Sequence, residues 1–187
     1  MLEQKVGMLF RRACRVPLLP VGERQGGPLI EGEAVEALLP HRGPFLFIDR
    51  ITHVGRSPGA HALPAGEPVG KIVCRYDLIR AMPILSGHFP GRPLWPGVFQ
   101  VEAVGQAGFC LFRLLSEEAV AEQPPACMLT DILAGRFLRP IVPDGEVEIV
   151  TQILRDGLFV IVVGQCLIHD QVCSAAAVRG IEKEASL

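Results

Sequence analysis

The chain carries little charge and few aromatic residues for its length. Charged residues make up 20% of its 187 positions and aromatic residues 6%, whereas hydrophobic residues make up 49%. The net charge of −2 argues against nucleic-acid binding, since proteins that bind nucleic acids present a basic surface. Such an apolar composition is unusual for a soluble monomer, and it predicts that part of the surface is buried against another subunit.

The cysteines and histidines lack the spacings of metal sites and disulfide frameworks. There is no C-x-x-C pair, several cysteines lie in apolar runs, and the five histidines show no ligand spacing. We therefore expect reduced thiols in the core of a cytoplasmic protein, and no metal site. The cysteines are Cys14, Cys74, Cys110, Cys127, Cys166 and Cys173.

The N-terminal residues lack the apolar region of about 7–15 residues that a secretory signal needs. A transit peptide is an alternative, but Glu3 and Glu23 argue against it. We predict that residues 1–29 are an extension, either mobile or lying over a neighbouring subunit. The chain has no internal repeat or low-complexity tract, and its length fits one domain, predicted over residues 30–187.

The most informative stretch is SGHFPGRPLWPGVFQVEAVGQAGFCLFR, residues 86–113. Pro96 stands where a helix would begin, and residues 97–116 are apolar on nearly every face, which predicts a buried helix. Glu102 and Arg113 interrupt the run before the roughly 20 apolar residues of a membrane span. The helix also contains Gly105 and Gly108, each costing about 1 kcal/mol relative to alanine, which predicts close approach of another backbone or a ligand.

Glu102 is the anomaly in this helix. Burial would raise the pKa of its carboxyl group and let it donate a proton near neutral pH. The alternative is that Glu102 faces water or pairs with an arginine. His88 in the preceding loop would by itself be read as structural, but a nearby carboxyl group and a helix N-terminus make it a candidate base. The N–H group of Gly97 at the helix start could bind a developing oxyanion.

Three segments resemble one family. GHFPGRPLWPGVFQVEAVGQAG is similar to the active-site segment of the FabZ-type 3-hydroxyacyl-acyl-carrier-protein dehydratases, which have the hotdog fold. LLPHRGPFLFIDRI and GRFLRPIVPDGEVEI resemble two other segments of that family, in the same order, so the resemblance covers about residues 33–181. It implies His88 and Glu102 as the catalytic pair, Gly97 as the oxyanion-binding residue and Gln106 as the residue that orients Glu102. Glu102 favours the plain dehydratase, because the related dehydratase-isomerases have Asp at this position.

The resemblance also implies the fold and the partners. The fold class is α+β, with an antiparallel sheet wrapped around one long central helix. The subunits would form a homodimer or a trimer of dimers, with the histidine of one subunit meeting the glutamate of the other. The substrate would be carried on the phosphopantetheine arm of an acyl-carrier protein, without a cofactor and away from any membrane. Arg136 and Arg139 are candidate docking residues, or else ordinary solvated strand residues.

Apolar runs and turn residues predict the remaining elements. Asp156-Gly157 between two β-branched runs is a strong hairpin signal. A Gly/Pro-rich loop or hairpin is expected over residues 53–68 and a polar connection over residues 117–125. A short helix is expected over residues 31–39. Strands are predicted over residues 45–54, 69–76, 126–138, 146–155, 158–169 and 172–181.

Several residues beside the predicted site depart from the family pattern. Trp95 replaces a common Met, Phe99 and Gln100 replace a Leu/Ile-type pair, and Phe109 replaces a Gly. These changes would reshape the acyl tunnel, and they favour a specialised dehydratase of a polyketide-like or secondary pathway over a fatty-acid housekeeping enzyme. The alternatives are another hotdog enzyme, such as a thioesterase or dehydratase-isomerase, or a non-catalytic module that binds acyl-carrier protein or acyl-CoA. The predicted tunnel residues are Phe89, Trp95, Pro96, Val98, Phe99, Phe109 and Phe137.

Overall fold

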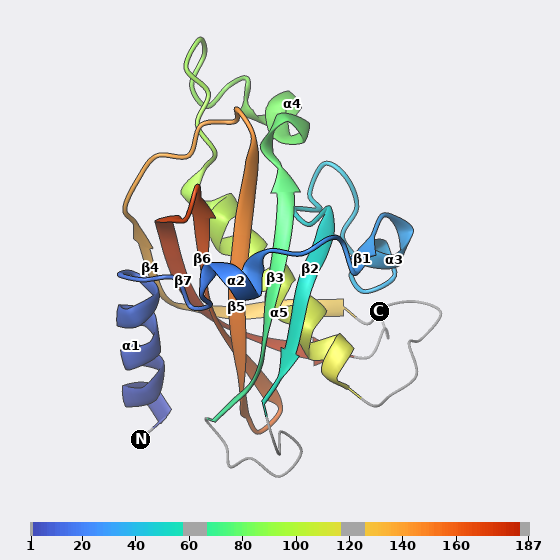
Figure 1. Cartoon of the computed structure of the whole chain (residues 1–187), viewed down its shortest axis with the longest axis vertical. Coiled ribbons are helices and arrows are strands. Elements are labelled where there is room, and N and C mark those ends of the chain that lie inside the picture. Colours follow the sequence, from blue (N-terminus) through green and yellow to red (C-terminus); the bar gives the residue numbers. More distant parts are fainter. Residues whose placement is uncertain (1, 58–66, 117–125, 184–187) are drawn as a thin grey trace.

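Seven antiparallel strands form one sheet in the order β1-β2-β3-β5-β6-β7-β4. The structure is a computed structural model that describes residues 2–57, 67–116 and 126–183. Figure 1 shows the long helix α5, Gly97–Leu115, behind the strands, and the short helix α2, Val21–Arg24, in front of them. The strands are β1 Ile30–Glu31, β2 Arg50–Arg56, β3 Pro68–Asp77, β4 Ala126–Phe137, β5 Glu146–Asp156, β6 Phe159–Ile168 and β7 Gln171–Lys183.

Helix α5 packs along the inner face of the sheet because its side chains are largely apolar and because its glycines have no side chain. A side chain at Gly108 would lie 2.3 Å from Val162 of β6, so only glycine lets helix and strand approach this closely. The close approach predicted at Gly105 is not found among the described residues, since no neighbouring atom lies within 4 Å of the position that a side chain there would take. The helix is long and apolar enough to cross a membrane, but 61% of it is buried inside the fold, as in the core helix of a folded domain.

The outer face of the sheet is covered by the N-terminal strap, which we define as residues 2–19. Helix α1, Leu2–Ala13, is amphipathic, and it turns Val6 and Ala13 inward. Together with Leu18 and Leu19 these residues join an apolar cluster on β3, β5, β6 and β7. The sequence predicted that residues 1–29 are mobile or lie over a neighbouring subunit. The strap lies on the chain's own sheet, because that face is apolar and its burial is favourable.

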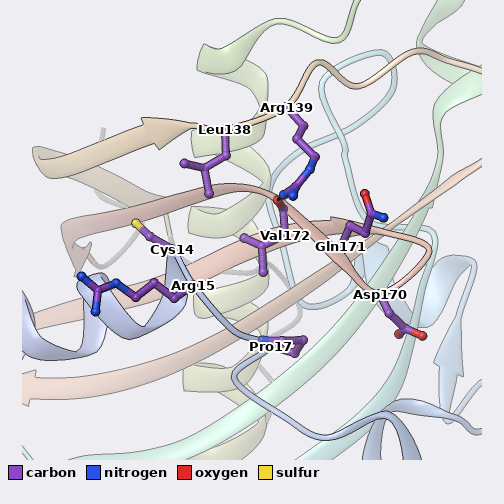
Figure 2. A pocket seen from close by; sticks show the side chains of 8 residues that line it. All are labelled: Cys14, Arg15, Pro17, Leu138, Arg139, Asp170, Gln171 and Val172. Atoms are coloured by element: carbon purple, nitrogen blue, oxygen red, sulfur yellow. Dashed lines mark hydrogen bonds between the residues drawn. The ribbon is translucent and has the colours of Figure 1, made fainter.

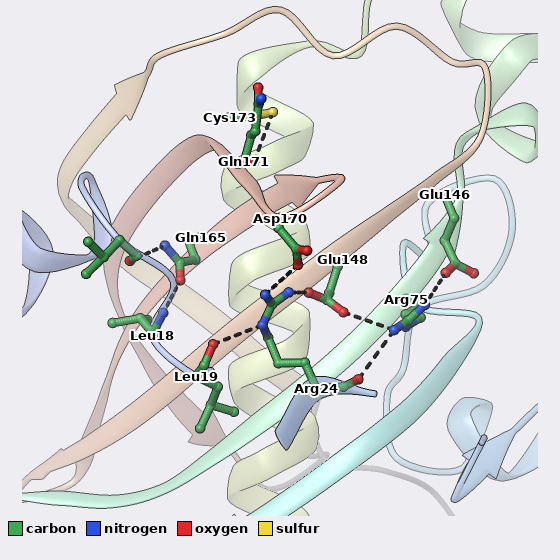
Figure 3. A network of polar contacts seen from close by, with 11 residues as sticks. Leu18, Leu19, Arg24, Arg75, Glu146, Glu148, Gln165, Asp170, Gln171 and Cys173 are labelled. Atoms are coloured by element: carbon green, nitrogen blue, oxygen red, sulfur yellow. Dashed lines mark hydrogen bonds and ion pairs between the residues drawn. The ribbon is translucent and has the colours of Figure 1, made fainter. Parts of the chain in front are cut away.

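Two buried polar side chains hold the strap and the residues after it in place. The amide of Gln165 on β6 accepts a hydrogen bond from the N–H of Leu18 at 2.5 Å and donates one to the carbonyl of Ala13 at 2.7 Å. Arg24 donates to the carbonyl of Leu19 at 2.9 Å and pairs with Glu148. Figure 3 shows both clusters. Since these partners satisfy buried groups, the path of the strap is well defined.

Most predicted elements are confirmed, including the central helix and the last four strands. The strand predicted over residues 45–54 begins only at Arg50, because Gln106 bonds the carbonyl of Phe45 and the N–H of Phe47 in place of a neighbouring strand. The helix predicted over residues 31–39 shortens to α3, Glu33–Glu36. The connection over residues 117–125 and residues 58–66 of the predicted loop lie outside the described residues.

Candidate active site

His88 lies in the loop between α4, Met82–Leu85, and the start of α5. Its N–H donates to the carbonyl of Leu85 at 2.8 Å, and its carbonyl accepts from the N–H of Leu94 at 2.7 Å. Its ring atom Nδ1 lies 3.0 Å from the carbonyl oxygen of Leu94. A carbonyl can only accept, so Nδ1 carries the proton and Nε2 of the neutral ring keeps its lone pair. The imidazole is therefore arranged as a base.

A cavity of about 520 Å³ opens beside His88, at the N-terminus of α5. The first helical hydrogen bonds run from the N–H groups of Phe99 and Gln100 to the carbonyl of Pro96, which leaves the N–H of Gly97 outside the helix's own bonding. A side chain at Gly97 would lie 2.7 Å from the ring of Phe137, so glycine keeps room between helix and ring. The cavity thus joins a base to a helix N-terminus, which favours negative charge.

Four of the seven predicted tunnel residues line this cavity: Trp95, Pro96, Val98 and Phe137. Trp95 is buried and stacks on Tyr76 with ring centroids 6.2 Å apart. Val98 and Phe137 are exposed in the single chain. The wall of the cavity is therefore rigid at Trp95 and open on the side of Val98 and Phe137.

The other three predicted tunnel residues are not among those that line this cavity. Phe89 is exposed and stacks on the ring of His88. Phe99 stacks on Phe47, with centroids 5.2 Å apart. The ring of Phe109 is buried between helix and sheet, 2.7 Å from the position a side chain at Gly180 would take. The prediction for Phe109 is thus corrected: the missing side chain at Gly180 leaves space on β7, and the ring fills it as part of the core.

Glu102 faces the segment before β2. Its Oε1 accepts a hydrogen bond from Gln106 at 3.0 Å and lies 3.3 Å from Nε2 of His41. The hydrogen bond from His41 lowers the pKa of Glu102, and the bond from Gln106 adds to this effect, against the opposing effect of burial. We expected burial to raise this pKa. The direction is the reverse because the carboxylate is only partly buried and two side chains donate to it.

The role of Gln106 as an orienting residue has a clear geometric basis. Its side-chain oxygen accepts from the N–H of Phe47 at 2.8 Å, and its nitrogen donates both to the carbonyl of Phe45 at 2.8 Å and to Glu102. A buried amide with these bonds has one orientation. Gln106 therefore fixes the position of the Glu102 carboxylate relative to the segment before β2.

Within a single chain the structure does not bring His88 and Glu102 into one cavity. His88, Gly97 and Gln100 line the cavity at the helix start, whereas Glu102 does not and instead contacts His41 and Gln106.

The two predicted docking arginines are exposed at the end of β4 and just beyond it. Arg139 lines the cavity beside His88, and its guanidinium donates to the carbonyl of Val172 at 2.6 Å. Arg136 lies close enough to Cys14 of the strap to affect the pKa of that thiol. Arg139 therefore lies at the rim of the candidate site, whereas Arg136 lies near the N-terminal strap.

Comparison with known proteins identifies the family of the chain. The model of the FabA-like domain matches residues 39–177, most of the chain. The chain belongs to the FabA-like family. Among its relatives is a 3-hydroxyacyl-[acyl-carrier-protein] dehydratase FabZ of Campylobacter curvus, 31% identical over 156 residues, which are 82% of this chain and 97% of the relative. The FabZ of an Anaeromyxobacter species is 33% identical over 71% of this chain and 77% of the relative.

A solved structure of this fold confirms the architecture. The dehydratase heterocomplex ApeI:P of Xenorhabdus doucetiae aligns with a TM-score of 0.56 and 18% identity over 86% of this chain and 94% of that one. At that identity the likeness is to the fold alone. The hotdog fold predicted for this FabA-like chain, a sheet around one long helix, is confirmed.

Sequence reasoning missed His41 as a residue of the FabA-like site. His41 lies in the segment LLPHRGPFLFIDRI, which carries part of the family resemblance, but nothing in the spacing connects it to Glu102, 61 positions later. The structure places its Nε2 against the Glu102 carboxylate, and its Nδ1 is buried without a partner among the described residues. His41 is therefore a candidate positioning residue, and its hydrogen bond is the largest cause of the lowered pKa of Glu102.

Proposed function

We propose that the chain dehydrates 3-hydroxyacyl thioesters carried on acyl-carrier protein to trans-2-enoyl thioesters. The observation that carries the proposal is the bond between Nδ1 of His88 and the carbonyl of Leu94, which leaves Nε2 free in a cavity that also contains the helix start at Gly97. The FabA-like family membership and the FabZ relatives support the same activity.

Each catalytic group has one step in this reaction. Nε2 of His88 takes the proton from the α-carbon, and the N–H of Gly97 binds the thioester oxygen as it gains charge. One such donor lowers the activation barrier by roughly 3 kcal/mol in comparable enzymes. Glu102 gives a proton to the 3-hydroxyl group, which leaves as water while the double bond forms. Because its pKa is lowered, this step uses the small protonated fraction of the Glu102 carboxyl group. The reaction breaks one C–H bond and one C–O bond, forms the C=C bond and releases water without net oxidation or reduction, and the proposal includes no cofactor.

We place the two catalytic side chains in one site by pairing two copies of the chain as a homodimer. Strand β4 stands at the edge of the sheet, where free backbone groups can pair with another strand. Its exposed side chains are largely apolar, with Ile132 59% exposed and Phe137 55% exposed. Such an edge favours burial against a second copy, which would bring Glu102 of one subunit toward His88 of the other. A trimer of such dimers is compatible with this arrangement.

The shape of the cavity supports a specialised substrate. Trp95 stands where the family commonly has Met, and its ring is held by Tyr76 and Phe47 with centroids 6.2 and 6.0 Å away. A rigid ring narrows the cavity next to His88, whereas a flexible Met side chain would adapt to different acyl chains. We propose short or rigid acyl groups, as in a polyketide-like secondary pathway.

A panel of 3-hydroxyacyl thioesters on acyl-carrier protein tests the function. Mass spectrometry should show the loss of one water, and the product should be the trans-2-enoyl thioester. A free acid would identify a thioesterase, and a cis-3 double bond would identify a dehydratase-isomerase. Carrier protein recovered unchanged across the panel would contradict the proposal.

Replacing His41 by Leu should move the pH dependence of the reaction. The hydrogen bond that lowers the pKa of Glu102 is lost, so that pKa rises and the carboxyl group stays protonated to higher pH. The limb of the kcat/KM profile on which activity falls as Glu102 ionises should therefore move to higher pH. His53→Leu, on β2, is the control. An unchanged limb, or one that moved to lower pH, would contradict the role of His41.

The same substitution has a predicted effect on stability. The pKa of Glu102 is lowered in the folded chain, so the ionised carboxylate stabilises the fold above its ordinary pKa. This contribution is lost as the pH falls through the lowered value. The destabilisation caused by His41→Leu should accordingly be larger at neutral pH than at acid pH, as measured by thermal unfolding.

A further inference from the structure

The N-terminal strap ends beside the rim of the proposed active site. After α1, residues Cys14, Arg15 and Pro17 line one side of a groove of about 530 Å³. Its other walls are Leu138 and Arg139 after β4 and the turn from Asp170 to Val172 (Figure 2). Leu138 and Arg139 also line the cavity that contains His88. The strap and the active-site entrance therefore share a wall.

Three arginines gather at this groove from two distant parts of the sequence. Arg15 and Arg139 line it, and Arg136 is close enough that it acts, as Arg15 does, on the thiol of Cys14. Within residues 2–57, 67–116 and 126–183 no carboxylate forms an ion pair with any of the three. The carboxylate in the groove, Asp170, is paired with Arg24 at 2.6 Å. We define Arg15, Arg136 and Arg139 as the basic rim.

The position of Arg15 is set by the fold. The carbonyls on either side of it, those of Ala13 and Val16, both accept hydrogen bonds from Gln165, at 2.7 and 3.2 Å. The N–H of Leu18 donates back to the same side chain. Gln165 is buried in the sheet, so the backbone around Arg15 is fixed while its guanidinium remains in solvent. A charge held in this way is pre-organised for binding, which lowers the entropic cost of association.

We propose that the N-terminal strap extends the surface on which the acyl-carrier protein docks, by adding Arg15 to the arginines beside the active-site cavity. The inference rests on the proposed function, which supplies the partner. An acidic carrier complements three arginines without carboxylate partners, and it would approach where its phosphopantetheine arm can enter the cavity beside Arg139. The strap lies outside the residues 39–177 that match the FabA-like domain, so Arg15 is not part of the matched domain.

Arg15→Glu tests the proposal, with Arg155→Glu as the matched control. Arg155 is also exposed, but it lies at the other end of the sheet. Glu148 on β5 lies opposite Leu167 on β6, and Leu167 lies opposite Val172, the groove residue on β7. Arg155 is seven residues further along β5, roughly 23 Å away at about 3.3 Å per residue. Both substitutions change the net charge equally, so a difference between them reports the location of the charge.

The measurement compares one 3-hydroxyacyl group on acyl-carrier protein and on N-acetylcysteamine. In Arg15→Glu the ratio of kcat/KM for the carrier-borne substrate to kcat/KM for the small thioester should fall about tenfold at low salt. In Arg155→Glu the ratio should stay as in the unaltered chain. The difference should shrink as the ionic strength rises from roughly 0.05 to 0.5 M, because salt screens exposed charges.

Three results would overturn the proposal. One is an unchanged ratio in Arg15→Glu, and another is an equal fall in Arg155→Glu. The third is an equal loss with the free phosphopantetheine thioester, which would show that Arg15 binds the phosphate and not the protein. If the unaltered chain dehydrates neither substrate, the proposed function fails instead. Calorimetric titration with holo-carrier protein then decides the docking, because Arg15→Glu should still weaken binding relative to Arg155→Glu.

Discussion

His88→Asn should lower kcat/KM for dehydration by about 10²–10⁴-fold without unfolding the chain. The side-chain nitrogen of Asn can still donate to the carbonyl of Leu94, as Nδ1 of His88 does at 3.0 Å, so the loop keeps its bond. What the variant loses is Nε2 and its lone pair. Glu102→Gln should cause a loss of the same order. The new amide can still accept from Gln106, but it has no ionisable proton to give to the leaving hydroxyl group.

The controls separate lost chemistry from lost structure. His53→Asn on β2 and Glu33→Gln on α3 make the same changes away from the site and should keep full activity. All four variants should unfold cooperatively. The melting temperature at neutral pH should stay close to that of the unaltered chain in three of them and fall moderately in Glu102→Gln, which loses the stabilising ionised carboxylate. If either site variant kept activity within tenfold of the original, its residue would not be the base or the acid, and the proposed mechanism would be wrong.

Local sequence patterns were sufficient to predict the central helix and which candidate residues lie near one another along it. A continuous apolar run after Pro96 requires a buried helix, and the structure has α5 from Gly97 to Leu115. His88 and Gly97 meet in one cavity because only nine positions of stiff loop separate them. Gln106 contacts Glu102 because residues four apart share a helix face. Each of these contacts depends on neighbours in the sequence.

Contacts between residues far apart in the sequence determine the features that local sequence patterns did not predict. His41 reaches Glu102 only because the segment before β2 folds over α5, and this contact reverses the direction in which the pKa of Glu102 moves. Phe109 packs in the core because β7 has a glycine opposite it, at Gly180. The strap lies on the outer face because Gln165, far along the chain, binds its backbone. Periodicity shows that a residue is buried, but it does not show which partner buries it.

Mixing the two inactive variants, His88→Asn and Glu102→Gln, should restore dehydration. In the structure His88 lines the cavity at the helix start while Glu102 faces His41, so one chain does not unite them. In a mixed two-fold dimer one site combines two altered residues and the other combines the intact His88 of one subunit with the intact Glu102 of its partner. With random exchange about half of the dimers are mixed and half of their sites are intact, so activity should recover to about a quarter of the original.

The recovery has to come from subunit exchange. Differently tagged subunits, co-purified after brief dilution and reconcentration, measure the fraction of mixed dimers, and activity should rise in proportion to it.

Ile132→Lys on the exposed edge strand β4 gives a second test. A charge on that apolar edge opposes burial against another copy, so the variant should be monomeric at low concentration and inactive although His88 and Glu102 are both present. A mixture with demonstrated exchange but no recovered activity, or an active monomer of Ile132→Lys, would mean that each site forms within one chain. Glu102 would then have to turn away from His41 to reach the cavity of its own subunit.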